Sequence, residues 1–216
     1  MIIAIGLYPG FTALDAIGPY QVFTNIPGAD VVLCAAQKAT VDDDNDLLHL
    51  CIEATFDDIS RPDVLLVPGG DSARRFAREG HPVLDWVRRA HPHTTWTTSV
   101  CTGALILGGA GLLDGQLATT HWAAYDDLAS YGARPTEQRV VQAGRILTGA
   151  GVSAGIDLAL TVAAKLTNPE IAQAIQLGIE YDPQPPFDAG APSKAPKHIH
   201  DMVAGVIASR HPGTVA

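Results

Sequence analysis

The strongest constraint on the fold of this chain comes from one stretch, TTSVCTGALIL at residues 97–107. Residues 94–100 predict a β-strand, and the small residues 102–104 then open an apolar segment that predicts a helix. Cys101 lies at the corner between them. A nucleophile at such a turn sits in a strained bend, beside the backbone N–H groups of the helix N-terminus. We therefore expect these amides to lower the pKa of the Cys101 thiol and to hydrogen-bond an anion that develops on a substrate.

The composition is that of a globular protein. With 216 residues, 47% apolar and 17% charged, the chain can fill one well-packed core, so we expect a single domain over residues 1–216. The net charge of −9 comes without a basic block, which argues against nucleic acid and against an anionic membrane surface as partners. Residues 1–7 are apolar but too short to span a bilayer, and no basic leader precedes them, so we expect a cytoplasmic protein.

Cysteine usage agrees with a reducing compartment. Cys34, Cys51 and Cys101 cannot all pair, and no C-x-x-C spacing occurs, which argues against a disulfide framework and against a cysteine-based zinc site. Cys34 falls in a buried apolar run and is interpreted as an inert core thiol. Cys51 and His49 are interpreted as structural.

Apolar strands alternate with helical segments along most of the chain. Residues 29–36 have the continuous apolar pattern of a strand buried on both faces, and residues 63–70 predict the next strand, which ends on a Gly pair. Residues 72–91 predict a charged helical segment with a solvated face that includes Arg74. This alternation predicts an α/β three-layer sandwich around a mostly parallel sheet. Near the end, residues 182–196 predict a Pro/Gly-rich arm, and residues 197–209 predict a helix that packs on the domain or on a second copy of it.

Candidate site residues follow the predicted strands. Parallel strands present their carboxyl ends at one edge of a sheet, where ligands bind, and this rule brings together Gly69, Gly70, Cys101, Thr102, Ala150 and Gly151. Asp15 follows the first strand, in an irregular stretch before a helix expected to start near Pro19. It is either a turn or cap carboxylate, or an acid within reach of the Cys101 thiol.

The histidines give weaker signals. His121 ends a short predicted strand and is interpreted either as packing beside Trp122 or as a group near the thiol. The pairs at 91 and 93 and at 198 and 200 are spaced i, i+2, which points the two rings apart on a helix, so we predict no metal site.

Four motifs in order carry a family resemblance: Leu14-Asp15 followed by Gly18-Pro19, PGG at 68–70, SVCTGA at 99–104 and ATTHW at 118–122. Together they resemble the ThiJ/PfpI superfamily of cysteine-elbow proteins over nearly the whole chain. The resemblance implies a flavodoxin-like α/β fold with the cysteine at a strand-to-helix nucleophile elbow. Within the superfamily the chain is most similar to the isonitrile (isocyanide) hydratases, which pair the elbow cysteine with an aspartate where many relatives use glutamate. Residues 180–188 also resemble those enzymes.

The resemblance implies a hydro-lyase that converts isocyanides to N-substituted formamides. Cys101 would attack the terminal carbon to give a thioimidate, and Asp15 would supply a proton and then help position or deprotonate water. The Thr102 hydroxyl would hydrogen-bond the site, and His121 matches a histidine that acts in some relatives. The candidates for oxyanion or substrate binding are Gly69, Gly70, Ala150 and Gly151. The resemblance further implies an uncharged isocyanide substrate, no metal or organic cofactor, and a homodimer.

Two alternatives stay open. The same thiol could serve a glyoxalase-like or hydrolytic member of the superfamily that acts on an aldehyde or an amide. The SVCTGA and TTHW motifs also occur in the sensory half of AraC-type transcription regulators. Such a regulator carries a basic helix-turn-helix region after the sensor, and since none follows in this acidic chain, we expect an enzyme.

Overall fold

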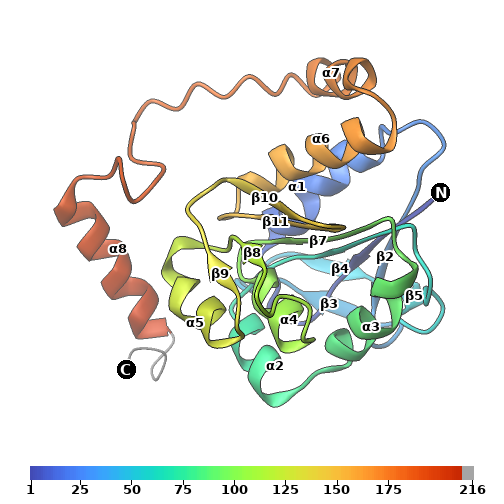
Figure 1. Ribbon diagram of the computed structural model, residues 1–216, viewed down its shortest axis with the longest axis horizontal. Coiled ribbons are helices and arrows are strands. Elements are labelled where there is room, and N and C mark those ends of the chain that lie inside the picture. The colour runs from blue at the N-terminus through green and yellow to red at the C-terminus, as the bar shows by residue number, and fades with distance from the viewer. Residues whose placement is uncertain (211–216) are drawn as a thin grey trace. The chain divides into compact units, whose positions relative to one another are not determined.

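A seven-stranded sheet forms the centre of residues 1–179 in the computed structural model, which describes residues 1–210 (Figure 1). The strand order is β10-β11-β7-β6-β1-β2-β5, and every pair is parallel except β10 with β11. The strands are β1 (Ile2–Gly6), β2 (Asp30–Ala35), β3 (Thr40–Asp42), β4 (His49–Cys51), β5 (Ala54–Thr55), β6 (Val64–Val67), β7 (Trp96–Val100), β8 (Leu117–Ala118), β9 (Arg134–Pro135), β10 (Val140–Ala143) and β11 (Ile146–Gly149). The helices are α1 (Ala13–Phe23), α2 (Ala73–Glu79), α3 (Pro82–Ala90), α4 (Gly103–Gly109), α5 (Tyr125–Ser130), α6 (Ala154–Leu166), α7 (Pro169–Gly178) and α8 (Lys197–Arg210), with 3₁₀ turns η1 (His91–His93) and η2 (Trp122–Ala124).

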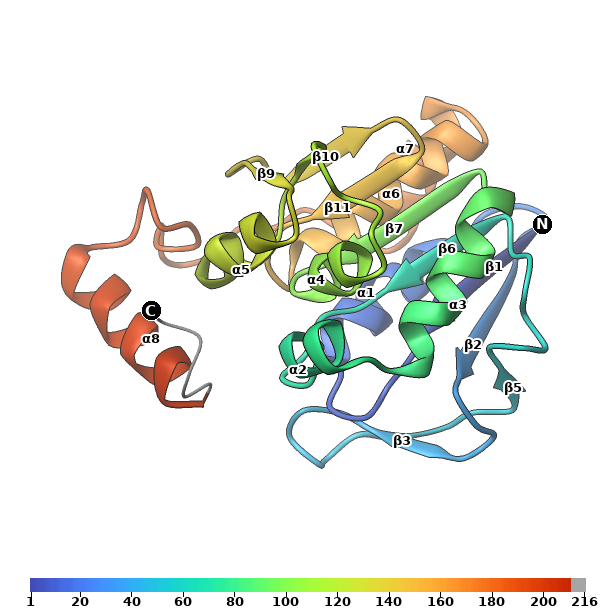
Figure 2. The same cartoon turned by 60° about the horizontal axis from the view of Figure 1, so that its bottom comes forward.

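The central strands are apolar enough to be buried on both faces. All four residues of β6 are buried, and β6 pairs in register with β1 on one side and β7 on the other, so that Leu66 lies beside Ile5 and Thr98. Figure 2 shows β7, β6, β1 and β2 side by side. The predicted α/β fold with a mostly parallel sheet is confirmed, and the parallel register places the carboxyl ends of β1, β6 and β7 at one edge.

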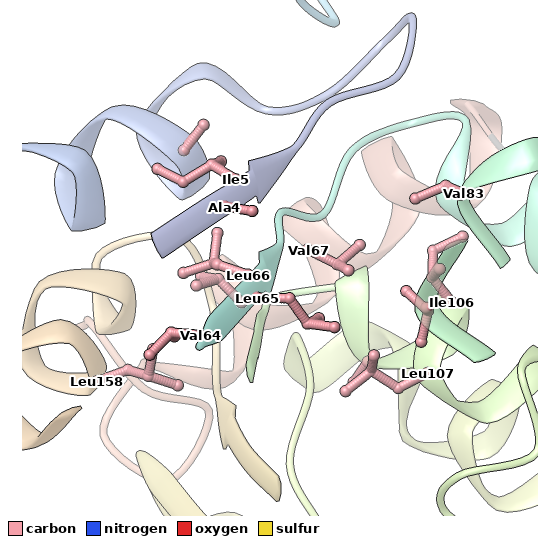
Figure 3. Packing of buried hydrophobic residues seen from close by; sticks show 14 of the residues in the cluster. Ala4, Ile5, Val64, Leu65, Leu66, Val67, Val83, Ile106, Leu107 and Leu158 are labelled. Carbon is pink, nitrogen blue, oxygen red and sulfur yellow. The ribbon is translucent and has the colours of Figure 1, made fainter. Parts of the chain in front are cut away.

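Helices cover both faces of the sheet. Helices α1 and α6 pack together on one face, while α2 and α3 pack with α4 on the other (Figure 1). Figure 3 shows β1 and β6 between these layers, with Leu158 of α6 on one side and Val83 of α3 and Ile106 of α4 on the other. These labelled side chains are almost fully buried, so the sheet is the middle layer of the core.

The prediction that a helix starts near Pro19 is wrong. Helix α1 begins at Ala13, and Pro19 lies inside it. A proline in a helix interior lacks an N–H donor and is unfavourable, but here its ring packs against α6, where a side-chain carbon at Gly155 would lie 3.1 Å from it. Tertiary packing therefore overrides the local preference, and Asp15 lies in the first helical turn instead of an irregular stretch.

One further sequence prediction needs correction. Residues 29–36 do not form a strand buried on both faces: β2, next to the short edge strand β5, is half-buried over Val31, Val32 and Leu33. Residues 72–91 are largely helical as predicted, and Gly80, with a φ of +93°, separates α2 from α3.

Arg74 does not belong to a solvated helix face as predicted. Its side chain is only 10% exposed, its Nε donates to Asp127 Oδ2 at 2.8 Å, and its Nη2 donates to the carbonyl of Ala123 at 2.9 Å. These bonds join α2 to η2 and α5.

The residues from Glu180 onward form a second compact unit. Residues 182–196 contain no helix or strand, and α8 follows from Lys197, with none of residues 197–210 buried. The single domain predicted for 1–216 stays a prediction, and its last residues, 211–216, lie outside the described part. Within residues 1–210, no helix has the length and apolar character needed to cross a membrane.

The contact between Gly6 and Trp86 gives a test of this packing. A side-chain carbon at Gly6 would lie 2.4 Å from Trp86 Cζ3, and that indole is fully buried, stacked on Phe56 and hydrogen-bonded to the carbonyl of Ile59. We expect Gly6→Ala to lower the free energy of unfolding by about 1–3 kcal/mol through overpacking. Denaturant unfolding measures this loss. Gly178→Ala, where nothing lies within 4 Å, is the control and should change stability by no more than about 0.5 kcal/mol. Equal effects of the two substitutions would contradict the packing described.

Candidate active site

Cys101 occupies a strained turn between β7 and α4. Its φ is +55°, in the left-handed region that side-chain-bearing residues rarely adopt. Three hydrogen bonds hold the turn: the Cys101 N–H donates to the carbonyls of Gly149 at 3.1 Å and Ala150 at 2.8 Å, and the Thr120 hydroxyl donates to the Cys101 carbonyl at 2.8 Å. The geometry is that of the predicted nucleophile elbow, with the sulfur fixed at the carboxyl edge of the sheet.

The sulfur is surrounded by Thr102 and Asp15. The Thr102 N–H and hydroxyl lie beside the sulfur and favour its ionised form, and the Asp15 carboxyl group lies beside the thiol. The Thr102 hydroxyl itself donates to the Gly70 carbonyl at 3.2 Å. Cys101 is only 5% exposed. Burial raises the pKa of the Cys101 thiol well above its ordinary value, the charge of Asp15 raises it further, and the two Thr102 groups oppose this. The predicted lowering of this pKa is therefore wrong, because loss of hydration outweighs the helix amides.

Asp15 is a buried acid whose pKa is raised. The residue has no exposed surface, and its Oδ2 accepts a hydrogen bond from the Gly69 N–H at 2.8 Å. Burial raises the pKa of Asp15 to about 7, against the lowering effect of the bonds from Gly69 and Cys101 and with a further rise from the charge of Asp44. Its other oxygen, Oδ1, is buried and has no hydrogen-bond partner in residues 1–210. Near neutral pH the carboxyl group can hold or release a proton beside the sulfur.

Gly69 and Gly70 hold these side chains in place. The Gly70 N–H donates to Thr102 Oγ1 at 2.9 Å, as the Gly69 N–H does to Asp15. A side-chain carbon at Gly69 would lie within 2.7 Å of both Asp15 Oδ2 and Thr102 Oγ1, so only glycine fits. Gly70 has a φ of +153°, and a side chain there would collide with the Gly10 carbonyl at 2.1 Å. Both amides thus orient the acid and the hydroxyl directly.

Ala150 contacts the elbow, and Gly151 lies next to His121. Ala150 supports the elbow through its carbonyl, and a side-chain carbon at Gly151 would lie 3.2 Å from His121 Cδ2. The His121 ring accepts a hydrogen bond at Nδ1 from the Ala123 N–H at 3.3 Å, which makes it the cap of η2. Burial, and then the charge of Arg74, lower the pKa of His121, so the ring is neutral near pH 7. Within residues 1–210, no hydrogen bond joins His121 to Cys101 or Asp15.

Three residues of this site were missed by sequence reasoning. The Tyr8 hydroxyl donates to the Pro68 carbonyl at 2.6 Å, Thr120 holds the elbow carbonyl, and Asp44 accepts a hydrogen bond from the Thr12 hydroxyl at 2.5 Å. Thr120 belongs to the ATTHW motif and Tyr8 follows the first strand, so each had a signal in the sequence. Asp44 had none, because only folding brings it to Thr12. In the described residues 1–210, no group of three or more His, Cys, Asp or Glu side chains is placed to hold a metal ion.

The raised pKa of Asp15 predicts a specific dependence of stability on pH. The folded-state pKa of about 7 exceeds the unfolded value of 3.8, so between these values the unfolded chain binds fewer protons and stability falls as pH rises. The slope from this one group reaches at most about 1.4 kcal/mol per pH unit. We expect Asp15→Asn, which cannot titrate, to lose less stability than wild type between pH 5 and pH 8 in denaturant unfolding. The exposed control Asp30→Asn should follow wild type, and a wild-type pH dependence in Asp15→Asn would contradict the assignment.

Comparison with known proteins agrees with this geometry. Residues 1–165 match the DJ-1/PfpI family. The isonitrile hydratase of Pseudomonas putida is 43% identical over 195 residues, covering 90% of this chain and 85% of that protein. A THiJ/PfpI family protein from Pseudomonas syringae superimposes with a TM-score of 0.91 at 40% identity, covering 96% of this chain and 86% of the other. The HTH-type transcriptional regulator CdhR of Pseudomonas aeruginosa is 30% identical over 122 residues, 56% of this chain but 36% of the regulator. The fold, the cysteine elbow and these similarities together show that the chain belongs to the DJ-1/PfpI family.

Proposed function

We propose that this protein is an isonitrile hydratase, a hydro-lyase that adds water to an isocyanide and releases an N-substituted formamide. The observation that carries the proposal is the buried pair of Cys101 and Asp15, in which a carboxyl group with a pKa of about 7 lies beside a thiol. The similarity to the isonitrile hydratase of Pseudomonas putida over 90% of the chain supports the same reaction.

The first half of the reaction forms a carbon–sulfur bond. With one proton shared by the pair, that proton passes from the Cys101 sulfur to Asp15, and the thiolate attacks the terminal carbon of R–N≡C. Asp15 then delivers the proton to that carbon, which gives the thioimidate R–N=CH–S–Cys101 and leaves Asp15 ionised. The Thr102 N–H and hydroxyl, which lie beside the sulfur, stabilise the thiolate before attack.

The second half consumes water. Ionised Asp15 accepts a proton from a water molecule as the water oxygen bonds to the thioimidate carbon, and Asp15 passes that proton to the nitrogen, which gives R–NH–CH(OH)–S–Cys101. The carbon–sulfur bond then breaks, the remaining hydroxyl proton passes to the sulfur, and R–NH–CHO leaves with Asp15 ionised again. Atoms balance as one isocyanide plus one water, and both halves use side chains of this chain alone. The buried, largely uncharged surroundings of the sulfur favour an uncharged substrate.

We also propose that the protein forms a homodimer and that it is located in the cytosol. Support comes from exposed apolar side chains on α1, namely Leu14 and Tyr20, which a second copy would cover, and from three cysteines that are all free in the described structure. Sedimentation analysis of the full chain would give twice the monomer mass of 22.7 kDa.

The central test is mass spectrometry after brief exposure to a simple isocyanide, combined with an assay of formamide release. We expect an adduct on Cys101 that Cys101→Ala abolishes, and a turnover loss of at least about a hundredfold in Asp15→Asn. Cys51→Ala, which removes an exposed thiol away from the pair, is the matched control and should retain wild-type turnover. An adduct that forms equally well without Cys101 would overturn the mechanism. Release of lactate from methylglyoxal in place of formamide would favour the glyoxalase-like alternative, and isocyanide binding without turnover would favour a sensor.

Thr102 gives a second prediction for the same reaction. Its hydroxyl lies beside the sulfur, accepts the Gly70 N–H and donates to the Gly70 carbonyl, so Thr102→Val leaves the Gly70 N–H without this partner and removes the hydroxyl from the sulfur. We expect Thr102→Val to lower kcat by about tenfold or more, and Thr102→Ser to recover most of the activity because it keeps the hydroxyl. Equal kcat values for the Val and Ser variants would show that the hydroxyl has no part in the reaction.

A further inference from the structure

The phenol of Tyr8 lies behind the reacting pair, on the far side of one peptide unit. Tyr8 follows β1, its side chain is fully buried, and its ring packs edge-on against Phe76 with ring centres 5.6 Å apart. Its hydroxyl donates a hydrogen bond of 2.6 Å to the carbonyl of Pro68. A short hydrogen bond from a phenol into the backbone beside the site has no role in the reaction described above.

The Pro68 carbonyl and the Gly69 N–H belong to the same planar peptide group. In a trans peptide these two groups point in opposite directions, so fixing the carbonyl fixes the direction of the N–H. That N–H is the donor to Asp15 Oδ2 at 2.8 Å. Tyr8 and Asp15 are therefore the two ends of one chain of hydrogen bonds, phenol to carbonyl and amide to carboxylate.

The peptide group has little freedom to relax. A side-chain carbon at Gly103 would lie 2.7 Å from the Pro68 oxygen, and one at Gly69 would lie 2.6 Å from the Thr102 nitrogen, so α4 packs closely against both ends of the unit. A donor to the carbonyl also polarises the amide and strengthens its N–H as a donor.

From this geometry we infer that Tyr8 is a positioning residue, which sets the strength of the Gly69 N–H bond to Asp15 through the Pro68–Gly69 peptide. For the reaction, the inference rests on the proposed function, because it assigns Tyr8 the task of setting the pH range in which Asp15 and Cys101 hold one proton between them.

The surrounding charges agree with this role. Burial raises the pKa of the Tyr8 phenol well above its ordinary value, and the charges of Asp15, Cys101 and Asp44 raise it further, so the phenol stays a neutral donor. The other titratable ring packed near it is His81, at 6.3 Å between ring centres, whose pKa is lowered by burial and by Arg75. Asp15 itself faces the Cys101 thiol and the charge of Asp44.

Loss of the phenol hydroxyl should raise the pKa of Asp15. The Gly69 hydrogen bond lowers the pKa of Asp15, whereas burial raises it. A weaker Gly69 bond therefore lets burial raise the pKa further. In Tyr8→Phe, which keeps the ring packed on Phe76, we expect the Asp15 midpoint to move up by about half a pH unit.

The direct measurement is carbon-13 NMR titration of the side-chain carboxyl groups, with the Asp15 signal assigned by its loss in Asp15→Asn. This readout needs no substrate, so it tests the inference even where wild type releases no formamide. Tyr131→Phe, which removes the hydroxyl of a partly buried tyrosine at the end of α5, is the matched control and should leave the Asp15 midpoint unchanged. An Asp15 midpoint in Tyr8→Phe equal to that of wild type would overturn the inference.

The pH profile of formamide release links the effect to catalysis. Below the Asp15 midpoint both groups are protonated and the thiol is not activated, so kcat/KM should rise with pH through about 7 in wild type. In Tyr8→Phe the rise of kcat/KM should shift to higher pH together with the NMR midpoint of Asp15. We expect kcat/KM about threefold below wild type at pH 6 and near wild type at pH 8.5. A loss of equal size at every pH would mean a purely structural role and would contradict the inference.

A second variant covers the case in which Tyr8→Phe does not fold. Site-specific 3-fluorotyrosine at position 8 has a more acidic phenol and donates a stronger hydrogen bond, so the Asp15 midpoint should move down. A midpoint that stays the same or moves up would again overturn the inference.

Discussion

A buried carboxyl group beside a buried thiol is the interaction on which the rest of this structure depends. Asp15 has no exposed surface and Cys101 is 5% exposed, so burial raises the pKa of both groups and neither ionises readily alone. What makes the arrangement useful is its set of fixed donors: the Gly69 N–H on Asp15, and the Thr102 N–H and hydroxyl beside the sulfur. The pair can then exchange one proton near neutral pH without loss of a surrounding polar contact. Water would supply the same donors in solution, but it would also compete for the reacting carbon.

The backbone around this pair is held in conformations that the chain does not adopt by local preference. Cys101 keeps a φ of +55° because the carbonyls of Gly149 and Ala150 bind its N–H and Thr120 binds its carbonyl. Gly149 ends β11, the parallel neighbour of β7, and Ala150 follows it, so the central sheet holds the elbow N–H, while Thr120 comes from the segment after β8. The tight contacts of Gly69 serve the same end, since any side chain there would displace both Asp15 and Thr102.

The family shares this scaffold among different proteins, and the site decides between them. Residues of this chain are similar both to an isonitrile hydratase and to part of a transcription regulator, so the fold and the cysteine elbow alone do not assign a reaction. The proposed hydration of an isocyanide depends on three features of the site: an aspartate in the first turn of α1, a hydroxyl beside the sulfur, and a backbone N–H that binds the acid.

The sequence by itself determined the elements that carry strong local signals. The buried runs of β1 and β6, the turn at Cys101 and the order of the four motifs were enough to predict the α/β fold, the elbow and the family. Only the tertiary structure decided how these elements meet. Packing of Pro19 against α6 starts α1 early enough to bury Asp15, burial then reverses the expected direction of the Cys101 pKa, and folding brings Asp44 to Thr12 and Tyr8 to Pro68. The physical reason is that local propensity depends on neighbours in the chain, whereas hydration and the partners of buried polar groups depend on segments that lie far apart in it.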